Sequence, residues 1–206
     1  MKPRKATVIC LDLEGVLVPE IWHGVARHTG IADFGLTTRD LADYDSLMQH
    51  RIKLLNQHRL TLPDIQAVIA KLKPLPGARE FLDQLRQRYQ VVILSDTFYE
   101  FAEPLMAQLR RPSLFCHHLV IDDQQRIVNY QLRQKDPKRV AVEAFQQMAL
   151  RVLAAGDSYN DLTMLQAADQ GFFFRPPESI ACQHPEILVT SEYDQLLTAF
   201  SQATYP

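Results

Sequence analysis

The chain contains 206 residues, of which 47% are hydrophobic and 22% are charged, and its formal net charge is −2. This length suits one domain or a core domain with a small insertion, and the composition excludes a disordered or strongly basic protein. Because no stretch approaches the roughly 18 apolar residues of a membrane span and no basic run alternates with aromatic residues, we expect a cytoplasmic protein that binds neither membranes nor nucleic acids.

Four short runs of apolar or β-branched residues alternate with stretches of helical periodicity. The runs are Val8–Leu11, Val91–Leu94, Val152–Ala155 and Phe172–Phe174. Strands that alternate with helices predict βαβ units and a parallel sheet, so the predicted fold class is α/β with a Rossmann-like sheet. Because right-handed crossovers bring the carboxyl ends of parallel strands to one edge, we expect the polar residues that follow these runs to converge there.

The stretch between the first two predicted strands carries helical patterns and no strong strand signal. We expect one helix to open at Pro19-Glu20 and two more to cover residues 43–58 and 63–71. A helical insertion at this place would cover and desolvate a site at the strand ends. The chain is therefore predicted to contain two domains, a small helical cap of residues 18–74 and a core of residues 1–17 and 75–206.

The rest of the chain is predicted to complete the core with helices and a peripheral hairpin. Asp136 is expected to cap a helix whose first residue is Pro137. The predicted helices cover residues 80–88, 102–109, 137–148, 161–168 and 193–200, and the hairpin joins 119–121 to 127–128.

Carboxylates follow two of the predicted strands. Asp12 and Glu14 come after the first strand, and Asp157 and Asp161 come after the third. Crowded negative charge requires a cation, and oxygen ligands without His or Cys favour a hard ion such as Mg²⁺. We therefore predict that all four carboxylates form a Mg²⁺ site, a kind of site that usually binds a phosphate as well.

The same residues suit phosphoryl transfer. Asp12 is predicted to attack phosphorus and form an aspartyl-phosphate, and Glu14 to protonate the leaving oxygen and then activate water. Ser95 is expected to donate its hydroxyl to a phosphate oxygen, although the Ser-Asp-Thr segment taken alone is better explained as a helix cap. Lys138 lies in the first turn of a predicted helix, where a cation opposes the macrodipole, so it is the predicted anion clamp. Lys135 is the alternative clamp, and a solvated surface charge is the simpler explanation.

Two charged residues of the predicted cap suit the two ends of an amino acid. Arg51 shares the apolar face of its helix with Met48 and Leu55, so its guanidinium either extends past that surface or binds a carboxylate. Glu20 lies in the first turn of a helix, where it either complements the dipole or binds an ammonium group.

These motifs resemble those of the haloacid dehalogenase superfamily. Asp12-x-Glu14-Gly15, Ser95, a lysine that opens a helix and the segment Gly156–Asp161 occur in that superfamily's order. The position of the predicted cap and the amino-acid sequences of the motifs resemble those of phosphoserine phosphatases, including the ones that transfer the phosphoryl group to homoserine. The resemblance implies Mg²⁺, O-phosphoserine as substrate, homoserine as an acceptor, and cytoplasmic serine and threonine biosynthesis. It also implies a set of substrate-binding residues, which are Glu20, Arg51, Ser95, Asp96, Lys138 and Asn160.

The sequence departs from the superfamily's pattern at two positions and leaves several alternatives open. Glu14 stands where Asp is usual, which lengthens this acid/base side chain by one methylene, and Asp96-Thr97 replaces the usual Gly-Gly after Ser95. A receiver-type signalling domain would lack the insertion, and a metal-free dehalogenase would not need Glu14. A phosphatase of other small phosphate monoesters is the closest alternative. A homodimer is one arrangement that the sequence allows.

Overall fold

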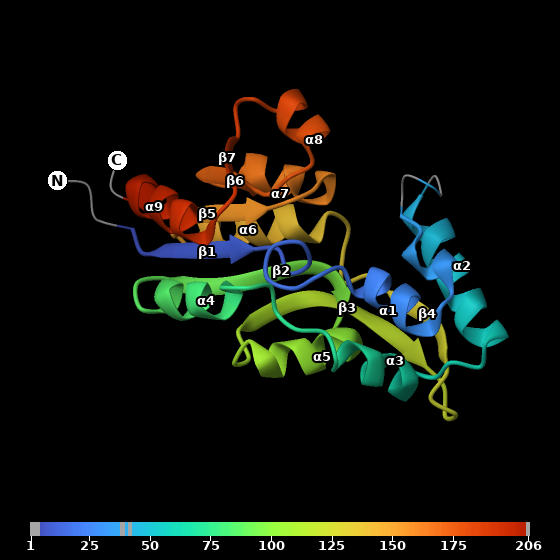
Figure 1. Ribbon diagram of the computed structural model, residues 1–206. Helices are drawn as coiled ribbons and strands as arrows, with labels where there is room; N and C mark the ends of the chain where they lie inside the picture. The colour runs from blue at the N-terminus through green and yellow to red at the C-terminus, as the bar shows by residue number, and fades with distance from the viewer. Residues whose placement is uncertain (1–4, 38–39, 41–42, 205–206) are drawn as a thin grey trace.

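The structure is a computed structural model that describes residues 5–37, 40 and 43–204. The described residues form a seven-stranded sheet in the order β4-β3-β2-β1-β5-β6-β7, in which only the β3–β4 pair is antiparallel (Figure 1). The predicted α/β class with a mostly parallel sheet is confirmed. The strands are β1 (Thr7–Leu11), β2 (Gln90–Phe98), β3 (Ser113–Ile121), β4 (Ile127–Gln131), β5 (Arg151–Gly156), β6 (Gln170–Phe174) and β7 (Leu188–Thr190).

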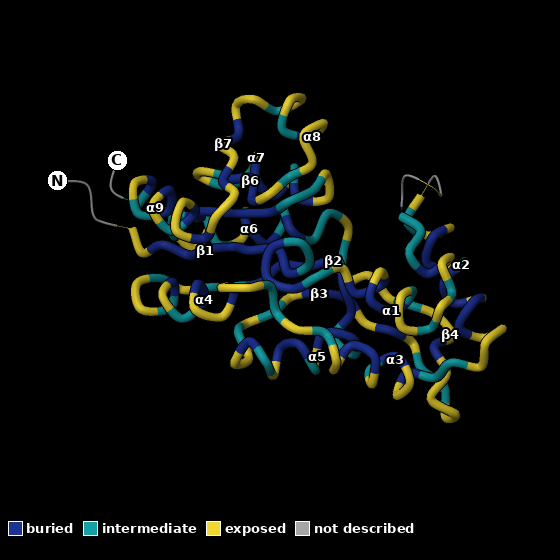
Figure 2. Tube along the Cα trace, viewed as in Figure 1, coloured by how far each residue is buried: buried dark blue, intermediate teal, exposed yellow. Residues whose placement is uncertain are grey.

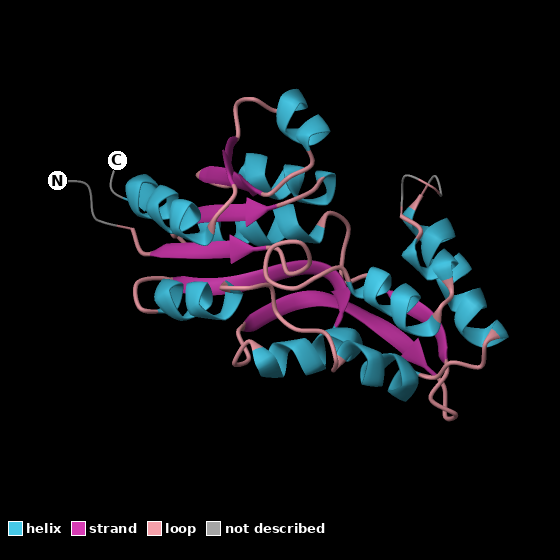
Figure 3. Cartoon of the chain, in the orientation of Figure 1, coloured by secondary structure: helices cyan, strands magenta, loops and turns pink. Residues whose placement is uncertain are grey.

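Helices cover both faces of this sheet, and further helices extend beyond the carboxyl ends of its central strands (Figure 3). Among the described residues, no helix combines the length and apolarity needed to cross a bilayer. The α-helices are α1 (Ile21–Thr29), α2 (Tyr44–Gln57), α3 (Leu62–Ile69), α4 (Ala78–Arg86), α5 (Tyr99–Gln108), α6 (Pro137–Gln147), α7 (Leu162–Ala167), α8 (Glu178–Gln183) and α9 (Tyr193–Thr204). Two short 3₁₀ helices are η1 (Ala32–Gly35) and η2 (Tyr159–Asp161).

Strand β1 lies at the centre of the sheet and is buried along its whole length (Figure 2). Its side chains alternate between two apolar clusters, because successive residues of a strand point to opposite faces. Ile9 and Leu11 pack in the cluster that includes α4, α5 and α9, whereas Val8 and Cys10 pack in the cluster that includes α6 and α7. Burial on both faces explains the continuous apolar run in the sequence.

Helices α1, α2 and α3 lie beyond the carboxyl ends of the central strands (Figure 1). Their contacts with the rest of the protein include α5, the β3–β4 hairpin and β2, where the Tyr44 hydroxyl donates to the Asp96 carbonyl oxygen at 3.3 Å. The Gln66 side chain donates to the Glu100 carbonyl oxygen at 2.7 Å, and the Tyr130 hydroxyl donates to Asp45 at 2.6 Å. This arrangement supports our division into a cap of residues 18–74 and a core of residues 1–17 and 75–206, which stays a proposal. Residues 1–4, 38–39, 41–42 and 205–206 lie outside the described part of these ranges.

Strand β2 extends farther than its apolar run predicted. It continues through Ser95-Asp96-Thr97, which we expected to follow the strand, and ends at Phe98, whose side chain is buried in the core. The pairing of β2 with β3 shifts register between Leu94 and Phe98, and we call this irregular stretch, residues 95–97, the β2 bulge. The predicted hairpin is present, but its first strand is longer and also pairs in parallel with β2.

One predicted helix start was wrong in detail and another was confirmed. Helix α1 begins at Ile21 with Glu20 as its N-cap residue, so Pro19 precedes the helix. Helix α6 begins at Pro137 with Asp136 as its N-cap residue, as the Asp-Pro pattern predicted. The φ of Asp136 is 48° and its side chain makes no capping hydrogen bond, because its carboxylate accepts hydrogen bonds from Arg139 and Thr163 instead. Strand β7 and helix α8 were not predicted.

Gly171 in β6 is required by close packing against α7. A Cβ at this position would collide with the carbonyl oxygen and the Cβ of Leu165. We expect Gly171→Ala to lower the free energy of unfolding by about 1–3 kcal/mol, because overpacking forces backbone shifts. Denaturant unfolding would measure this change. Gly35→Ala is the control, since its new Cβ would come no closer than 3.3 Å to another atom. Equal losses in both variants would contradict this assignment.

Candidate active site

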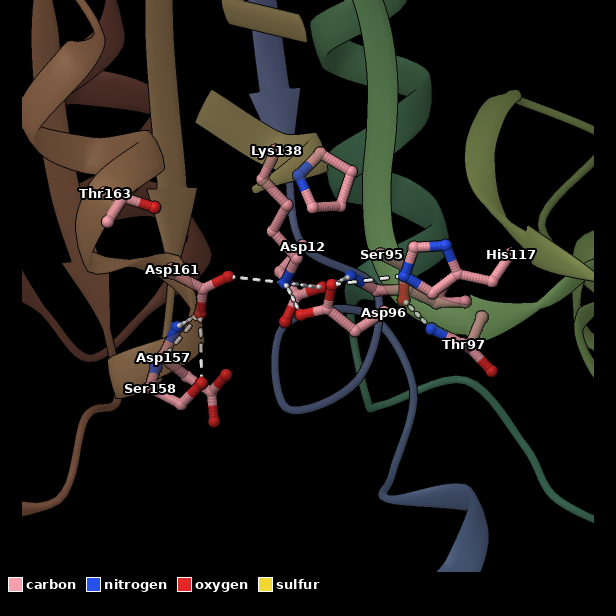
Figure 4. Close-up of polar contacts among 12 residues, drawn as sticks. Asp12, Ser95, Asp96, Thr97, His117, Lys138, Asp157, Ser158, Asp161 and Thr163 are labelled. Carbon is pink, nitrogen blue, oxygen red and sulfur yellow. Dashed lines mark hydrogen bonds and ion pairs between the residues drawn. The ribbon is translucent and has the colours of Figure 1, made fainter. Parts of the chain in front are cut away.

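The site is centred on the buried ammonium group of Lys138, near the start of α6 (Figure 4). Its Nζ lies 2.7 Å from Asp161 Oδ1, 3.0 Å from Asp12 Oδ1 and 3.3 Å from Asp96 Oδ2. Burial alone would lower the pKa of Lys138, but the three carboxylates together raise it well above its usual value. The lysine therefore stays charged and joins the ends of three separate chain segments.

Asp12 stands at the carboxyl end of β1, as predicted. Its backbone N–H donates to the Ala155 carbonyl oxygen at 3.0 Å, and its Oδ1 accepts a hydrogen bond from the Leu13 N–H at 2.7 Å. Asp12 is only 6% exposed. Burial and the negative charge of the nearby Asp161 raise the pKa of Asp12 well above its usual value, although the positive charge of Lys138 opposes the shift. A buried carboxylate with this excess of negative charge around it favours a bound cation.

Asp161 fixes the loop that follows β5. Its Oδ2 accepts hydrogen bonds from the backbone N–H groups of Asp157 at 2.9 Å and Ser158 at 3.0 Å, which leaves Oδ1 for Lys138. A Cβ on Gly156 would collide with the Asp161 carboxyl group, and a Cβ on Gly15 would collide with that of Asp157. Glycine at both positions lets the two loops approach each other closely enough to bring the carboxylates together.

Asp12, Asp157 and Asp161 form the group that fits a metal ion. One carboxylate oxygen from each lies within 4.8 Å of the other two. Burial raises the pKa of Asp157 to about 7, with the negative charges of Asp161 and Glu20 adding to the shift. All donors are oxygens and the net charge is negative, so the set fits a hard divalent cation.

Glu14 is the one predicted metal ligand whose carboxylate the structure does not place in this group. The backbone N–H of Ile21, at the start of α1, donates to Glu14 Oε2 at 2.8 Å. Burial raises the pKa of Glu14 to about 8, with the negative charge of Glu20 adding to the shift and the Ile21 hydrogen bond opposing it. This carboxylate therefore faces the helical segment, where a carboxylic acid that holds its proton near neutral pH suits a general acid.

Asp96 and Ser95 lie in the β2 bulge. Ser95 is 3% exposed and its Oγ accepts the Thr97 N–H at 3.3 Å, so its hydroxyl hydrogen is left for another partner. The second oxygen of Asp96 faces Nε2 of His117 at 3.7 Å. His117 was not predicted from the sequence, because a single histidine within a strand follows no recognisable pattern.

A cavity of about 420 Å³ lies over these residues. This volume is suitable for a small molecule, and residues from both the sheet edge and the helical segment line it. Asp161 is fully buried, and Lys135, the alternative anion clamp, is exposed and away from the cavity wall. Every other predicted site residue lines the cavity, namely Asp12, Glu14, Glu20, Arg51, Ser95, Asp96, Lys138, Asp157 and Asn160.

Arg51 reaches the cavity from α2. It is 8% exposed, its Nη2 donates to the Leu36 carbonyl oxygen at 2.8 Å, and its guanidinium lies 4.6 Å from the centre of the Trp22 ring. Its Nε is buried without a hydrogen-bond partner, and burial lowers the pKa of Arg51 to about 10. A buried, incompletely paired guanidinium on a cavity wall is suited to bind an anion such as a carboxylate. Glu20 lines the same cavity and is exposed.

Comparison with known proteins places this site in a family. Phosphoserine phosphatase ThrH of Pseudomonas aeruginosa is 57% identical over 197 residues, which cover 96% of each chain. A phosphoserine phosphatase of Pseudomonas syringae pv. tomato is 55% identical over 197 residues, which cover 96% of this chain and 83% of the relative.

A solved structure of a phospho-aspartyl intermediate analogue of phosphoserine phosphatase has the same fold. Its TM-score is 0.77 at 18% identity, and the match covers 95% of this chain and 99% of that chain. A family profile for haloacid dehalogenase-like hydrolases matches residues 6–169, which include every residue of the site. The resemblance in the motifs is thereby confirmed, and this chain belongs to the haloacid dehalogenase-like hydrolases.

Proposed function

We propose that this protein is a phosphoserine phosphatase that also transfers the phosphoryl group to homoserine. The observation that carries the proposal is one cavity with Asp12 and Lys138 at its base and the buried guanidinium of Arg51 on its wall. Such a cavity suits a molecule with a phosphate at one end and a carboxylate at the other. The two Pseudomonas relatives, both named phosphoserine phosphatase, support the same substrate.

Asp12, Asp157 and Asp161 would hold a divalent cation, for which Mg²⁺ is our proposal. Three carboxylates without nitrogen or sulfur ligands suit this ion, which usually keeps several of its waters. When bound, it neutralises negative charge on the phosphoryl group. The carboxylate of Glu14 points elsewhere, so we assign Glu14 to proton transfer rather than to the metal.

The reaction begins when a carboxylate oxygen of Asp12 forms a bond to phosphorus and the bond from phosphorus to the serine oxygen breaks. Lys138 and the Ser95 hydroxyl donate hydrogen bonds to the phosphoryl oxygens. Glu14 gives its proton to the leaving serine oxygen. The resulting carboxylate then removes a proton from water or an alcohol, whose oxygen attacks phosphorus and releases Asp12.

The two ends of the amino acid are assigned to the helical segment. Arg51 binds the carboxylate and Glu20 the ammonium group, while Asp96 and Asn160 complete the cavity wall. Homoserine exceeds serine by one methylene, a difference that a pocket discriminates by only about 1–3 kcal/mol. The cavity that binds serine therefore also suits homoserine as acceptor. We place this reaction in the cytoplasm, in serine and threonine biosynthesis.

The function is tested by incubating the protein with O-phosphoserine and Mg²⁺, with and without homoserine. We expect free phosphate in both reactions and phosphohomoserine only when homoserine is present, because both acceptors discharge the same phosphoenzyme. Phosphate is measured colorimetrically and phosphohomoserine by mass spectrometry. EDTA should abolish both products and added Mg²⁺ should restore them. Activity that survives EDTA, or equal turnover of hexose phosphates, would contradict the proposal.

Asp12→Asn should abolish phosphate release, because an amide is a poor nucleophile and cannot form the acyl phosphate. The change keeps the size of the side chain, so the variant should remain folded. Steady-state hydrolysis and trapping of the phosphoenzyme would measure the effect. Asp122→Asn is the matched control, since Asp122 lies in the β3–β4 turn, away from the cavity. Full activity in Asp12→Asn would refute the nucleophile assignment.

Arg51→Ala should mainly weaken substrate binding. Loss of hydrogen bonds to a charged group costs about 1.5–3 kcal/mol, which corresponds to a rise in KM of roughly 10- to 100-fold with a smaller change in kcat. Arg126→Ala serves as control, because Arg126 pairs with Asp122 at the surface. A fall in kcat with an unchanged KM would place Arg51 in the chemical step instead.

A further inference from the structure

The β2 bulge presents Asp96 to the cavity at the point where it meets Lys138. The side chain of Asp96 is 29% exposed, whereas the side chains of the other two carboxylates around Lys138 are 8% exposed for Asp12 and fully buried for Asp161. Asp96 also makes the longest of the three contacts, at 3.3 Å from Nζ. Of the three, it is therefore the carboxylate that an incoming anion meets first.

An ammonium group has three N–H donors, and each of the three carboxylates faces the Lys138 nitrogen. Asp161, which does not line the cavity, lies 2.7 Å from this nitrogen, and Asp12, which does, lies 3.0 Å from it. Because the contact with Asp96 is the longest and the most exposed, we expect a phosphoryl oxygen to take the donor that faces Asp96. Asp96 is thus a built-in competitor of the phosphoryl group for one hydrogen bond.

His117 provides Asp96 with a second partner. It lies in β3, is 2% exposed, and its Nδ1 accepts the backbone N–H of Arg133 at 3.1 Å. Because Nδ1 is an acceptor, the hydrogen of the neutral ring is on Nε2, which faces the second oxygen of Asp96 at 3.7 Å (Figure 4). Burial alone would raise the pKa of Asp96, but Lys138 and His117 together hold it below its usual value.

We propose that His117 is a positioning residue that holds the Asp96 carboxylate back from Lys138, so that one donor of the lysine is released to the phosphoryl group. The inference rests on the proposed function only in the choice of phosphoserine as substrate. The competition between Asp96 and a phosphate oxygen for Lys138 would apply to any phosphate bound there. Without the His117 N–H, Asp96 would pair more tightly with Lys138 and bind in place of the phosphoryl oxygen.

The test is a double-mutant cycle of His117→Leu and Asp96→Asn. His117→Leu should raise the KM for phosphoserine about tenfold with little change in kcat, the effect of one lost hydrogen bond to a charged group. In the Asp96→Asn background the same change should alter KM less than about twofold, because the competing charge is absent. His117→Gln, which keeps an N–H donor, should retain a KM close to wild type.

Calorimetric titration with inorganic phosphate in the presence of Mg²⁺ repeats the cycle without turnover. If the wild-type protein binds phosphate but does not hydrolyse phosphoserine, the proposed function is refuted. The inference about His117 is then decided by the phosphate affinities of the variants alone. Thermal unfolding shows which variants fold, and His117→Ala replaces His117→Leu if leucine does not fit. An equal effect of the His117 change in both backgrounds, or a His117→Gln variant as impaired as His117→Leu, would overturn the inference.

Discussion

The whole site depends on the single buried ammonium group of Lys138. A charge this deeply buried is tolerated only when it is paired and hydrogen-bonded, and here Asp12, Asp96 and Asp161 surround it. These residues come from the end of β1, the bulge of β2 and the loop after β5, so one nitrogen atom joins segments that are distant in the sequence. The negative charges around Lys138 exceed its single positive charge, and a divalent cation held by Asp12, Asp157 and Asp161 would offset most of the excess.

The demands of this cluster explain local features that sheet packing alone would not require. The parallel sheet brings the strand ends to one edge, but loops with side chains at positions 15 and 156 would keep the carboxylates apart. The bulge in β2 has a related effect, since it interrupts regular pairing with β3 and lets polar residues face the cavity before Phe98 returns to the core. Two backbone irregularities, the positive φ of Gly15 and the β2 bulge, thus lie beside residues that supply functional groups.

The sequence was most informative where one general rule applies. Asp12 and Asp157 could be placed together, because right-handed connections put the ends of parallel strands on the same edge. Arg51 could be placed on an inward face by its helical spacing from Leu55 and Met48, and it is indeed buried. The approximate positions of most helices followed from the same periodicity.

Features that depend on one specific tertiary contact could not be predicted. The direction of the Glu14 side chain follows from a hydrogen bond to Ile21, and a backbone donor seven residues away has no signature in the sequence. The extension of β2 was hidden because Ser95-Asp96-Thr97 is polar, which usually indicates a loop. His117 matters through Asp96 and through the backbone of Arg133, and neither contact is visible in a sequence pattern.

The attachment of Arg51 has a consequence for the order in which ligands leave. Its guanidinium donates a hydrogen bond to the Leu36 carbonyl oxygen and stacks on the Trp22 ring, and all three residues lie within residues 18–74. Lys138 instead pairs with carboxylates at the sheet edge. In the proposed reaction, an amino acid phosphate would contact both Arg51 and Lys138 and so bridge the helical segment to the sheet. After the phosphorus–oxygen bond breaks, serine would contact only Arg51 and the phosphoryl group only Lys138. In that reaction, bond cleavage itself would remove the link that the substrate makes between Arg51 and Lys138, so that serine could leave and the next alcohol or water could enter.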